Sequence, residues 1–207
     1  MNNTTIISKL NNFKKTLDFK ALDDLIHDLQ LEALSNGFKP SKTKANKKAL
    51  AYLKKAGGRN NTRPALNYST IIDYNNENIQ VFTDSYTMFK LKEHYILPDI
   101  SERPELTYPN VKRLIPDASA GESCQNAGDI EKFLAGLKAN VYKKDDETDC
   151  FTSESYKVHF DVNRLKQVIE ILGTLELKVN LFGSKKPNLF VDESTGNEAI
   201  LLPVRKY

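Results

Sequence analysis

The stretch of the chain that most clearly predicts its fold runs from Phe160 to Arg205 and reads FDVNRLKQVIEILGTLELKVNLFGSKKPNLFVDESTGNEAILLPVR. Apolar residues recur at every third or fourth position over 162–172, which is the spacing of one helix face. Asp161 stands where a helix N-cap is expected, and Gly173 stands where the helix would end. Strand-like runs bounded by turn residues surround this helix. They are expected at 156–160, 175–182, 188–192 and 199–205.

The same order of elements, a helix followed by three strands, is predicted earlier in the chain. A helix is expected over 44–56, ending at Gly57-Gly58, with lysines on one face and small or apolar residues on the other. No residue-level repeat relates the two parts, so they share only the order of their elements. The three strands are expected at 65–74, 79–82 and 87–91, with a turn at 75–78.

The remaining segments connect or extend these two parts. Four of the eight prolines lie in 98–117, which predicts an extended connection, and 118–128 is typical of a flexible loop. The expected fold class is therefore α+β, a single domain of two helix-plus-three-strand halves with an N-terminal helical extension. Helices are also expected at 5–36 and 129–138, with a linker at 39–44 and a charged loop at 143–149. The expected boundaries are 1–40 for the extension and 41–207 for the domain, with halves at about 41–97 and 129–207 and a connector at 98–128.

The composition argues against several classes of protein. The longest apolar runs are a few residues, whereas a membrane-spanning helix needs ~20. Cys124 and Cys150 cannot form a disulfide framework, and three scattered histidines weigh against a structural zinc site. No secretory signal is visible at the start of the sequence, so we expect a protein of the reducing cytoplasm.

The positive charge of the chain is concentrated in one block. No Asp or Glu occurs between Ala33 and Ile72, whereas nine Lys and Arg residues do, so a net charge of +3 leaves −6 for the rest. A basic block on an otherwise acidic chain is typical of proteins that bind a polyanion such as DNA. A solvated, partly flexible run of charge explains the same pattern, and both interpretations stay open.

Motifs for nucleotide chemistry are absent from the sequence. It contains neither a Gly-x-x-x-x-Gly-Lys-Ser/Thr loop nor a Gly-x-Gly-x-x-Gly turn. The acidic run 145–149 lacks the spacing and the glycine of a calcium loop. His159 lies in an expected strand, where a packed or edge histidine is the simpler interpretation. We therefore expect no enzyme activity, no metal site and no cofactor.

Four short stretches, in chain order, resemble the motifs of a known family. They are RPALN (63–67), FTDSYTM (82–88), YPNVKRLIP (108–116), and FDVN (160–163) together with AILLPVR (199–205). These resemble the R-x-x-L-N strand, the A-T-D-G-H-R-L turn, the F-P-D-Y-x-R-[VL]-[LI]-P connector, and the F-N-x-x-Y helix start with the C-terminal M-P-[MV]-R of the bacterial DNA polymerase sliding clamp, the polymerase III beta subunit. The resemblance covers about 44–117 and 155–207.

The resemblance implies one sliding-clamp-like domain that is much shorter than a clamp subunit. A bacterial clamp subunit has three domains of two such halves each, and two subunits close a ring. Only a short connection separates Lys92 from Tyr108 here, where the family has a further half-domain, and another is missing after Pro116. What remains resembles the first half of the middle domain joined to the second half of the last, as in a compact phage-type relative. A ring would need several copies of the chain as a homo-oligomer.

In the clamp family these stretches line a hydrophobic pocket that captures linear peptides of polymerases and clamp loaders. Two substitutions change the expected surface of that pocket. Ser85 replaces a glycine, so a turn with positive φ is less favourable, and Tyr86-Thr87 replaces His-Arg, which removes a positive charge. Carried over by position, the peptide-binding residues are Leu66, Thr83, Ser85, Tyr86, Thr87, Met88, Pro109, Arg113, Leu114, Ile200, Leu201, Leu202, Pro203, Val204 and Arg205.

In the family, helices face duplex DNA and contact its phosphates without reading bases, and the helix at 44–56 is in the matching place. Such contacts predict binding that is independent of sequence and sensitive to salt. The helix at 162–172 offers only Arg164 and Lys166, with Glu170 against them, so it is expected to contribute less. The expected DNA-facing residues are Lys42, Lys44, Lys47, Lys48, Lys54, Lys55 and Arg59.

Three functions are consistent with these observations. The first is a non-catalytic, replication-associated clamp-like protein that binds duplex DNA, clamp-binding peptides of replication proteins, or both. The second is a regulator or decoy that uses the peptide pocket without encircling DNA, and the third is a simple DNA-binding protein. The segment 30–34 (QLEAL) loosely resembles a clamp-binding peptide that could dock into a neighbouring copy, although helix residues are the simpler interpretation. Without the resemblance, Leu66, Met88, Leu114 and 200–204 would be read as core.

Overall fold

The computed structural model describes residues 40–58, 61–124, 129–139 and 151–204. The chain divides into two compact units, Met1–Lys44 and Ala45–Tyr207, and the second unit contains the sheet. The helices expected over 5–36, the peptide-like segment 30–34 and the acidic run 145–149 lie outside the described residues.

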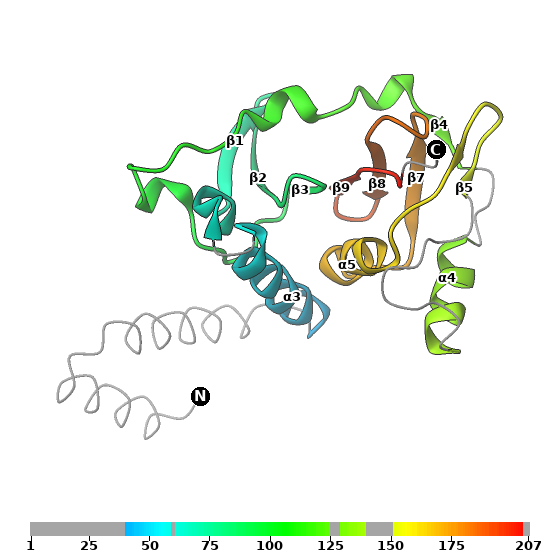
Figure 1. Cartoon of the computed structure of the whole chain (residues 1–207), viewed down its shortest axis with the longest axis horizontal. Helices are drawn as coiled ribbons and strands as arrows, with labels where there is room; N and C mark the ends of the chain where they lie inside the picture. The colour runs from blue at the N-terminus through cyan, green and yellow to red at the C-terminus, as the bar shows by residue number, and fades with distance from the viewer. Residues whose placement is uncertain (1–39, 59–60, 125–128, 140–150, 205–207) are drawn as a thin grey trace. The chain divides into compact units, whose positions relative to one another are not determined.

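Seven strands form one antiparallel sheet in the order β1-β2-β3-β9-β8-β7-β4 (Figure 1). Two sets of three consecutive strands, one from each half of the domain, meet where β3 pairs with β9. The register places Thr87 opposite Leu201 and Met88 opposite Ile200. The strands are β1 (Thr70–Tyr74), β2 (Glu77–Thr83), β3 (Thr87–Leu91), β4 (Glu122–Ser123), β7 (Leu177–Leu181), β8 (Asn188–Asp192) and β9 (Asn197–Leu201). A separate ribbon consists of β5 (Phe151–Thr152) and β6 (Lys157–Val158).

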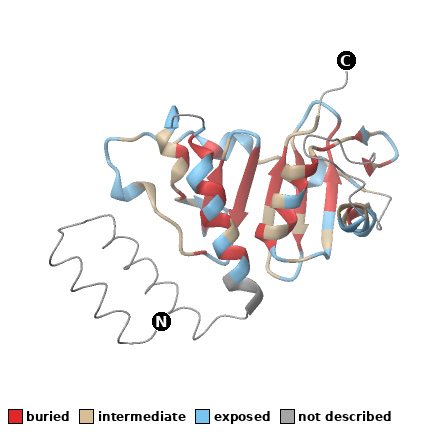
Figure 2. Ribbon diagram, turned by 60° about the horizontal axis from the view of Figure 1, so that its bottom comes forward, coloured by how far each residue is buried: buried red, intermediate tan, exposed pale blue. Residues whose placement is uncertain are grey.

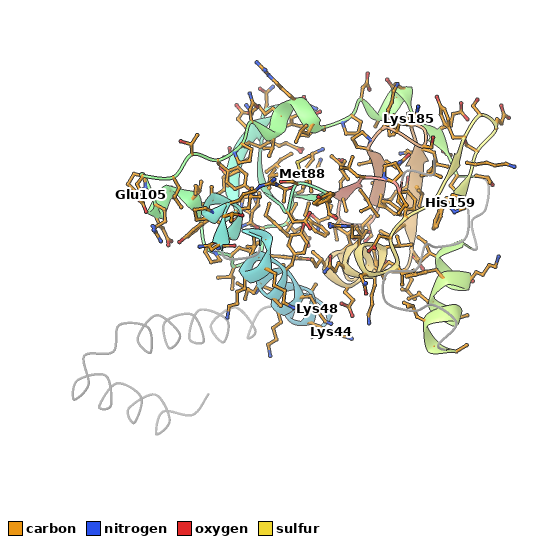
Figure 3. All side chains as sticks on the ribbon, viewed as in Figure 1. Lys44, Lys48, Met88, Glu105, His159 and Lys185 are labelled. Carbon is orange, nitrogen blue, oxygen red and sulfur yellow. The ribbon has the colours of Figure 1, made fainter. Side chains whose placement is uncertain are left out.

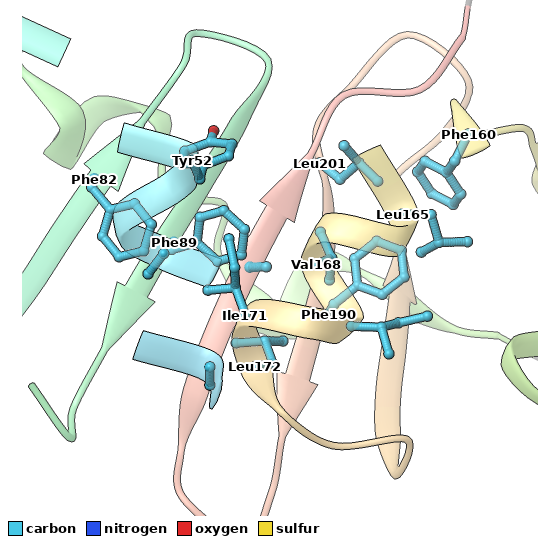
Figure 4. Close-up of a cluster of buried hydrophobic side chains, with 14 of the residues drawn as sticks. Tyr52, Phe82, Phe89, Phe160, Leu165, Val168, Ile171, Leu172, Phe190 and Leu201 are labelled. Atoms are coloured by element: carbon cyan, nitrogen blue, oxygen red, sulfur yellow. The ribbon is translucent and has the colours of Figure 1, made fainter. Parts of the chain in front are cut away.

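Helices α3 (Pro40–Ala56) and α5 (Val162–Leu172) lie on the same face of the sheet, and their sheet-facing sides are buried (Figures 1 and 2). Phe89 of β3 is fully buried, with its ring centroid 4.9 Å from that of Phe82 and 5.3 Å from that of Tyr52. Figure 4 shows these three rings beside the aliphatic side chains of α5. Because the cluster draws on both helices and on strands of both halves, the two halves share one hydrophobic core.

A third helix, α4 (Asp129–Lys138), adds two side chains to this core, Ile130 and Phe133. Its other apolar residues, Leu134 and Leu137, pack against the same cluster and are partly buried. The stripe of apolar residues in the sequence therefore faces inward, as the spacing predicts.

The opposite face of the sheet is covered by the connector between the halves. Val111 of the connector is buried against strand residues that include Val81 and Met88, and Tyr108 and Ile115 pack beside it. The side chains of β3 alternate between the two faces, so Phe89 points to the helices while Met88 points to the connector. The sheet is thus buried on both faces near its centre.

An ion pair joins β3 to β9 on the connector side of the sheet. Lys90 Nζ lies 2.8 Å from Glu198 Oε2, and the two residues are directly opposite in the register. Lys90 Nζ also lies 4.7 Å from the centroid of the Tyr74 ring. Only 7% of the lysine side chain and 18% of the glutamate side chain are exposed. A pair this buried leaves a costly unpaired charge when one partner is removed.

The two helix-plus-three-strand halves are confirmed. Helix α5 has the expected bounds, because the Asp161 carboxylate accepts a hydrogen bond from the Arg164 amide (2.8 Å) and Gly173 ends the helix with φ 75°. Strands β3 and β8 and helix α4 also have the bounds that the sequence predicts.

The segment before β1 was expected to be strand from residue 65, and this expectation is wrong. Pro64–Asn67 forms a 3-10 helix instead, and the strand begins at Thr70. Pro64 has no amide proton for a ladder, and the Asn67 side chain accepts a hydrogen bond from the Gly57 amide (2.7 Å). This bond holds the segment against the end of α3.

Three further boundaries differ from the expectation. Helix α3 begins at Pro40, so the expected linker at 39–44 is mostly helical, which fits the preference of proline for a first turn. Within the loop expected at 118–128, Glu122–Ser123 forms β4 on the edge of the sheet. In the expected strand at 156–160, the ladder includes only Lys157–Val158.

The connector is extended around its prolines but contains short 3-10 helices. Asp99 and Asp117 each accept a hydrogen bond from the amide two residues later, which starts a turn. These 3-10 helices are η3 (Ile100–Glu102), η4 (Val111–Leu114) and η5 (Ala118–Ala120).

The last strand was expected over 199–205, but β9 ends at Leu201. The chain then leaves the ladder. The Leu202 amide donates to the Tyr86 carbonyl (3.0 Å), and the Val204 amide donates to the His159 carbonyl (2.9 Å). Pro203, between them, has no amide proton to donate.

Among the described residues, none of the helices has the length and apolar character that crossing a bilayer requires.

The Lys90–Glu198 pair gives a test of how the halves are joined. Lys90→Met leaves the Glu198 carboxylate buried without its partner, so we expect the free energy of unfolding to fall by about 2–3 kcal/mol. The double variant Lys90→Met/Glu198→Leu should return to within about 1 kcal/mol of the wild type, since both charges are gone. Urea denaturation measures the free energies of unfolding of both variants.

Lys92→Met, which breaks the exposed Lys92–Glu77 pair, is the matched control and should leave the midpoint of urea denaturation almost unchanged. Equal losses in all three variants would contradict the role given to burial.

Candidate functional site

The turn between β2 and β3 is the centre of the candidate site. Ser85 has φ 78°, so the positive φ that the family's glycine would favour is present here in a serine. The Asp84 carboxylate accepts hydrogen bonds from the amides of Tyr86 (2.9 Å) and Thr87 (2.8 Å). The Thr83 hydroxyl donates to the Thr87 carbonyl (2.8 Å) and accepts from the Ser85 amide (3.0 Å). These bonds hold the strained turn in one conformation.

Two arginines from distant parts of the chain bind this turn. Arg63 Nη1 donates to the Ser85 hydroxyl (2.9 Å). Arg164 Nη1, from the first turn of α5, lies 2.7 Å from Asp84 Oδ2, and its guanidinium carbon is 4.2 Å from the centroid of the Tyr86 ring. The turn is therefore tied to the second half of the domain by an ion pair and a ring contact.

Tyr52 supports the turn from the core side. Its hydroxyl donates to the Thr87 carbonyl (3.0 Å) and is buried. Burial raises the pKa of the Tyr52 hydroxyl well above its ordinary value, and the nearby Asp84 charge raises it further. The phenol therefore stays protonated and keeps its role as a hydrogen-bond donor.

A largely apolar groove opens beside the Ser85 turn. Its volume is about 530 Å³. Leu66 forms part of its wall together with Leu106 and Pro109 of the connector. Burial raises the pKa of the Tyr108 hydroxyl in this wall, while the Thr83 backbone opposes the shift. The groove is lined by Arg63, Pro64, Ala65, Leu66, Ser85, Glu105, Leu106, Thr107, Tyr108 and Pro109. Figure 3 places Glu105 on the connector, away from the centre of the sheet.

The predicted peptide-binding residues fall into three groups. Leu66, Ser85 and Pro109 line the groove. Tyr86 and Leu114 are exposed apolar side chains, 54% and 52% accessible, and Arg113 is also exposed. The second group also includes the segment 202–204, which is half-buried and is held beside Tyr86 by the Leu202 amide. Arg205 lies outside the described residues.

The third group is buried in the sheet. Thr83, Thr87 and Met88 of the first half, and Ile200 and Leu201 of the second, are each less than 5% exposed. Met88 and Ile200 pack under the connector, and Leu201 packs under the helices. These residues shape the site from inside and offer almost no surface to a ligand. In this structure they are core residues, which is one of the interpretations that the sequence left open.

Several groove residues are missing from the sequence prediction. Glu105, Leu106 and Thr107 precede the connector motif, where the resemblance gives no guide. Tyr108 stands within that motif, and its position beside Pro109 was an available signal. Pro64 and Ala65 lie inside RPALN, but the 3-10 helix that turns them toward the groove was expected to be a strand.

Helix α3 presents lysines on the side away from the sheet. Lys44, Lys47, Lys54 and Lys55 are exposed, whereas Ala49 and Leu53 are buried. Figure 3 labels Lys44 and Lys48 near the N-terminal end of this helix. The side chain of Lys42 and the whole of Arg59 lie outside the described part of the chain.

Acidic residues reduce the positive charge of this surface. Lys48 Nζ is 2.9 Å from Glu170 Oε1 on α5. A cavity of about 220 Å³ between α3 and α5 is lined by residues that include Lys48, Lys55, Asp84 and Glu170. Within the described ranges, no carboxylate pairs with Lys47, Lys54 or Lys55, so these three remain the candidates for phosphate contacts. The same ranges contain no group of three His, Cys, Asp or Glu residues placed to hold a metal ion.

Comparison with known protein families finds no match to this sequence. Comparison with curated proteins finds none either. Comparison with solved structures does find similarity.

The solved structures that resemble this chain are bacterial sliding clamps. The beta sliding clamp of C. crescentus superposes with a TM-score of 0.52 and 13% identity over 78% of this chain. The DNA polymerase III beta chain of Streptococcus pneumoniae gives 0.51 and 16% over 80%. The sliding clamp of Bartonella birtlesii, solved bound to griselimycin, gives 0.52 and 13% over 70%.

These comparisons establish the fold. The chain has the sliding-clamp fold in the form of one α+β domain. It covers 64% of the C. crescentus and S. pneumoniae clamps and 59% of the B. birtlesii clamp, less than two thirds of each. At these identities the likeness concerns the arrangement of the backbone.

The strain at Ser85 leads to a prediction about this turn. A β-branched side chain is strongly disfavoured at φ 78°, so we expect Ser85→Val to lower the free energy of unfolding by about 1–2 kcal/mol. Ser85→Gly should cost little, because relief of the strain offsets the added flexibility. Thermal denaturation measures the difference. The same two substitutions at Ser184, an exposed serine without positive φ, should not show this order of stability. If Val and Gly are equivalent at position 85, the turn does not hold the conformation described.

Proposed function

We propose that the protein is a non-catalytic, replication-associated clamp-like protein that captures a linear peptide in the groove beside the Ser85 turn. The observation that carries this proposal is the meeting of two distant stretches, because the Leu202 amide donates to the Tyr86 carbonyl next to the groove. A partner peptide from replication proteins, in the cytoplasm, is the occupant that the clamp fold suggests.

The groove has the chemistry of a peptide site. Its walls are mostly apolar, with Leu106 and Pro109 of the connector available to one or two apolar anchors of a peptide, whereas Leu66 is almost fully buried and shapes the wall from inside. Burying one such anchor contributes ~1.5–3 kcal/mol before the cost of ordering the peptide. Arg63 and Ser85 provide polar atoms at the rim that can orient the peptide backbone. We therefore expect weak to moderate affinity.

The similar clamp of Bartonella birtlesii supports a ligand site on this fold. It was solved bound to griselimycin, so a clamp of this backbone arrangement accepts a bound molecule. For the present chain, exposed Tyr86 and Leu114 and half-buried 202–204 would extend the groove along the surface. The buried residues of the predicted set, such as Leu201, would act by shaping the site.

We also propose loose, sequence-independent contact of α3 with duplex DNA. Lys47, Lys54 and Lys55 project from one side of a helix whose other side is fixed in the core, so their charges point in one direction. Phosphate neutralisation by such lysines needs no base contacts. In this proposal Lys42, Lys44, Lys48 and Arg59 have supporting roles.

Encircling DNA would require several copies of this chain. One domain cannot close a ring, and β1 is an edge strand of the described sheet, with the Ser69–Asp99 bridge just before its start. In this version of the proposal, copies of the chain associate along their strand edges, as in a compact phage-type clamp.

A regulator or decoy that uses the groove without binding DNA is the second candidate. It is favoured by the ion pairs of Lys48 with Glu170 and of Arg164 with Asp84, which remove two positive charges from the helix face. A simple DNA-binding protein is the third candidate and requires only the lysines of α3.

Peptide capture is tested by placing a charge in the groove. Leu106→Arg introduces a cation into an apolar wall outside the main core, so we expect at least about tenfold weaker binding of a fluorescein-labelled clamp-binding peptide from a bacterial replicative polymerase. Fluorescence polarisation measures the affinity. Leu175→Arg changes an exposed leucine that does not line the groove and should bind like the wild type. Equal binding by both variants and the wild type would show that the groove is not the peptide site.

DNA contact is tested by removing the three lysines that lack acidic partners. In Lys47→Gln/Lys54→Gln/Lys55→Gln, we expect duplex binding at about 50 mM salt to weaken at least tenfold, and the slope of log K against log salt to fall by about 2–3. Titration of a labelled duplex at several salt concentrations measures both.

The matched control removes three exposed lysines elsewhere on the domain. Lys112→Gln/Lys185→Gln/Lys186→Gln has the same change in net charge and should keep the wild-type slope. The decoy function predicts no duplex binding by any of the three proteins. Equal losses in both triple variants would mean that overall charge, and not the face of α3, determines binding.

A further inference from the structure

We propose that the stacked pair of Tyr86 and Arg164 recognises a carboxylate of the bound peptide, so that the groove prefers a peptide with an acidic residue beside its apolar anchors. This inference rests on the proposed peptide capture. It changes the role of Arg164, which was expected on the DNA-facing side of its helix, to that of a specificity-determining residue.

The geometry of Arg164 places its cation against the ring of Tyr86, the residue that follows Ser85 of the groove. One guanidinium nitrogen lies 2.7 Å from Asp84, and the guanidinium carbon lies 4.2 Å from the centroid of the Tyr86 ring. A guanidinium has five N–H donors, and among the described residues the Asp84 contact is the hydrogen bond that it makes. About 28% of the side chain is exposed, so the remaining donors can reach a ligand.

The Asp84 carboxylate does not cancel this cation as a binding group. Its other oxygen accepts from the amides of Tyr86 and Thr87, so backbone donors already satisfy part of its charge. The pair fixes the guanidinium in one orientation, which lowers the entropy cost of binding a second carboxylate. The attraction of the guanidinium for a ligand carboxylate should be short-ranged, because the net charge of the Arg164–Asp84 pair is near zero.

The position of Tyr86 connects this cation to the groove. Ser85, its neighbour, lines the groove, and the Tyr86 carbonyl accepts from the Leu202 amide at the start of the half-buried segment 202–204. The Tyr86 ring is 54% exposed. An exposed tyrosine stacked on an ordered arginine is the kind of surface that dominates binding energy at interfaces. Asp84 and Arg164 are the charged groups that face this ring from the turn and from α5.

The experiment compares two peptides that differ in one charge. The labelled polymerase peptide is prepared with Asp or with Asn next to its apolar anchors, and affinity is measured by fluorescence polarisation. We expect the wild type to bind the Asp peptide about fivefold more tightly, as for one partly exposed ion pair. Arg164→Gln should lose this preference, so that its affinities for the Asp and Asn peptides become equal, and Arg164→Lys should keep part of it.

Two further variants keep the interpretation clear. Tyr86→Ala removes the stack but leaves the cation, so the preference should fall below that of the wild type. Lys185→Gln removes an exposed positive charge from the turn between β7 and β8 and should keep the full preference. Tyr86→Ala also provides the test if Arg164→Gln fails to fold.

The outcomes separate this inference from the proposed function. If neither peptide binds the wild type, peptide capture itself is wrong. If both peptides bind the wild type equally, or if Arg164→Gln keeps the preference, the groove binds peptides but the Tyr86–Arg164 pair does not read their charge.

Discussion

The pairing of β3 with β9 is the interaction on which the rest of the structure depends. The other long ladders, β1-β2-β3 and β7-β8-β9, join strands that follow one another in the chain and form within one half. Among the strands of the described residues, only β3 and β9 join the two halves along a ladder, and they place Met88 opposite Ile200 across more than a hundred residues of chain. Because side chains alternate along a strand, a shift of one residue would exchange the helix face for the connector face. The register therefore fixes both hydrophobic clusters and brings Leu202 to Tyr86.

Polar contacts between the halves follow from this pairing. Lys90 with Glu198, Asp84 with Arg164, and Lys48 with Glu170 each join a residue of the first half to one of the second. The first pair is nearly buried. Lys48–Glu170 is more exposed and joins α3 to α5, and Asp84–Arg164 joins the Ser85 turn to α5. Ion pairs between matched surfaces specify orientation more than they add free energy. The halves of this domain thus meet as two partners in an interface do, with a shared apolar centre and charges that set the register.

The sequence predicted the elements whose signals are local, and it failed where tertiary contacts decide. Helix α5 was predictable because Asp161, an apolar stripe and Gly173 all act within the helix itself. In residues 64–67 the local signal is weaker, a single proline at the first helical position. The Asn67 side chain also bonds to the Gly57 amide, a contact that depends on where α3 ends. The two residues of β4 form a strand because they pair with the edge of β7. In the candidate site the resemblance located the turn and the connector, but the sequence could not indicate which of those residues remain at the surface.

The division of the site between core and rim limits how its specificity can change. Thr87, Met88 and Leu201 hold the seam between the halves, so a substitution that alters the groove through them also disturbs the packing of the sheet. The side chains of exposed residues such as Tyr86 and Leu114 do not pack in the seam, so their replacement leaves the ladder intact. Two of the positions at which this turn differs from the clamp motif, Tyr86 and Thr87, differ in the same way. Tyr86 changes an exposed rim position, whereas Thr87 stands in the seam and is buried. Under the proposed function, differences in peptide preference should therefore be concentrated at the rim, while the buried positions preserve the meeting of β3 and β9.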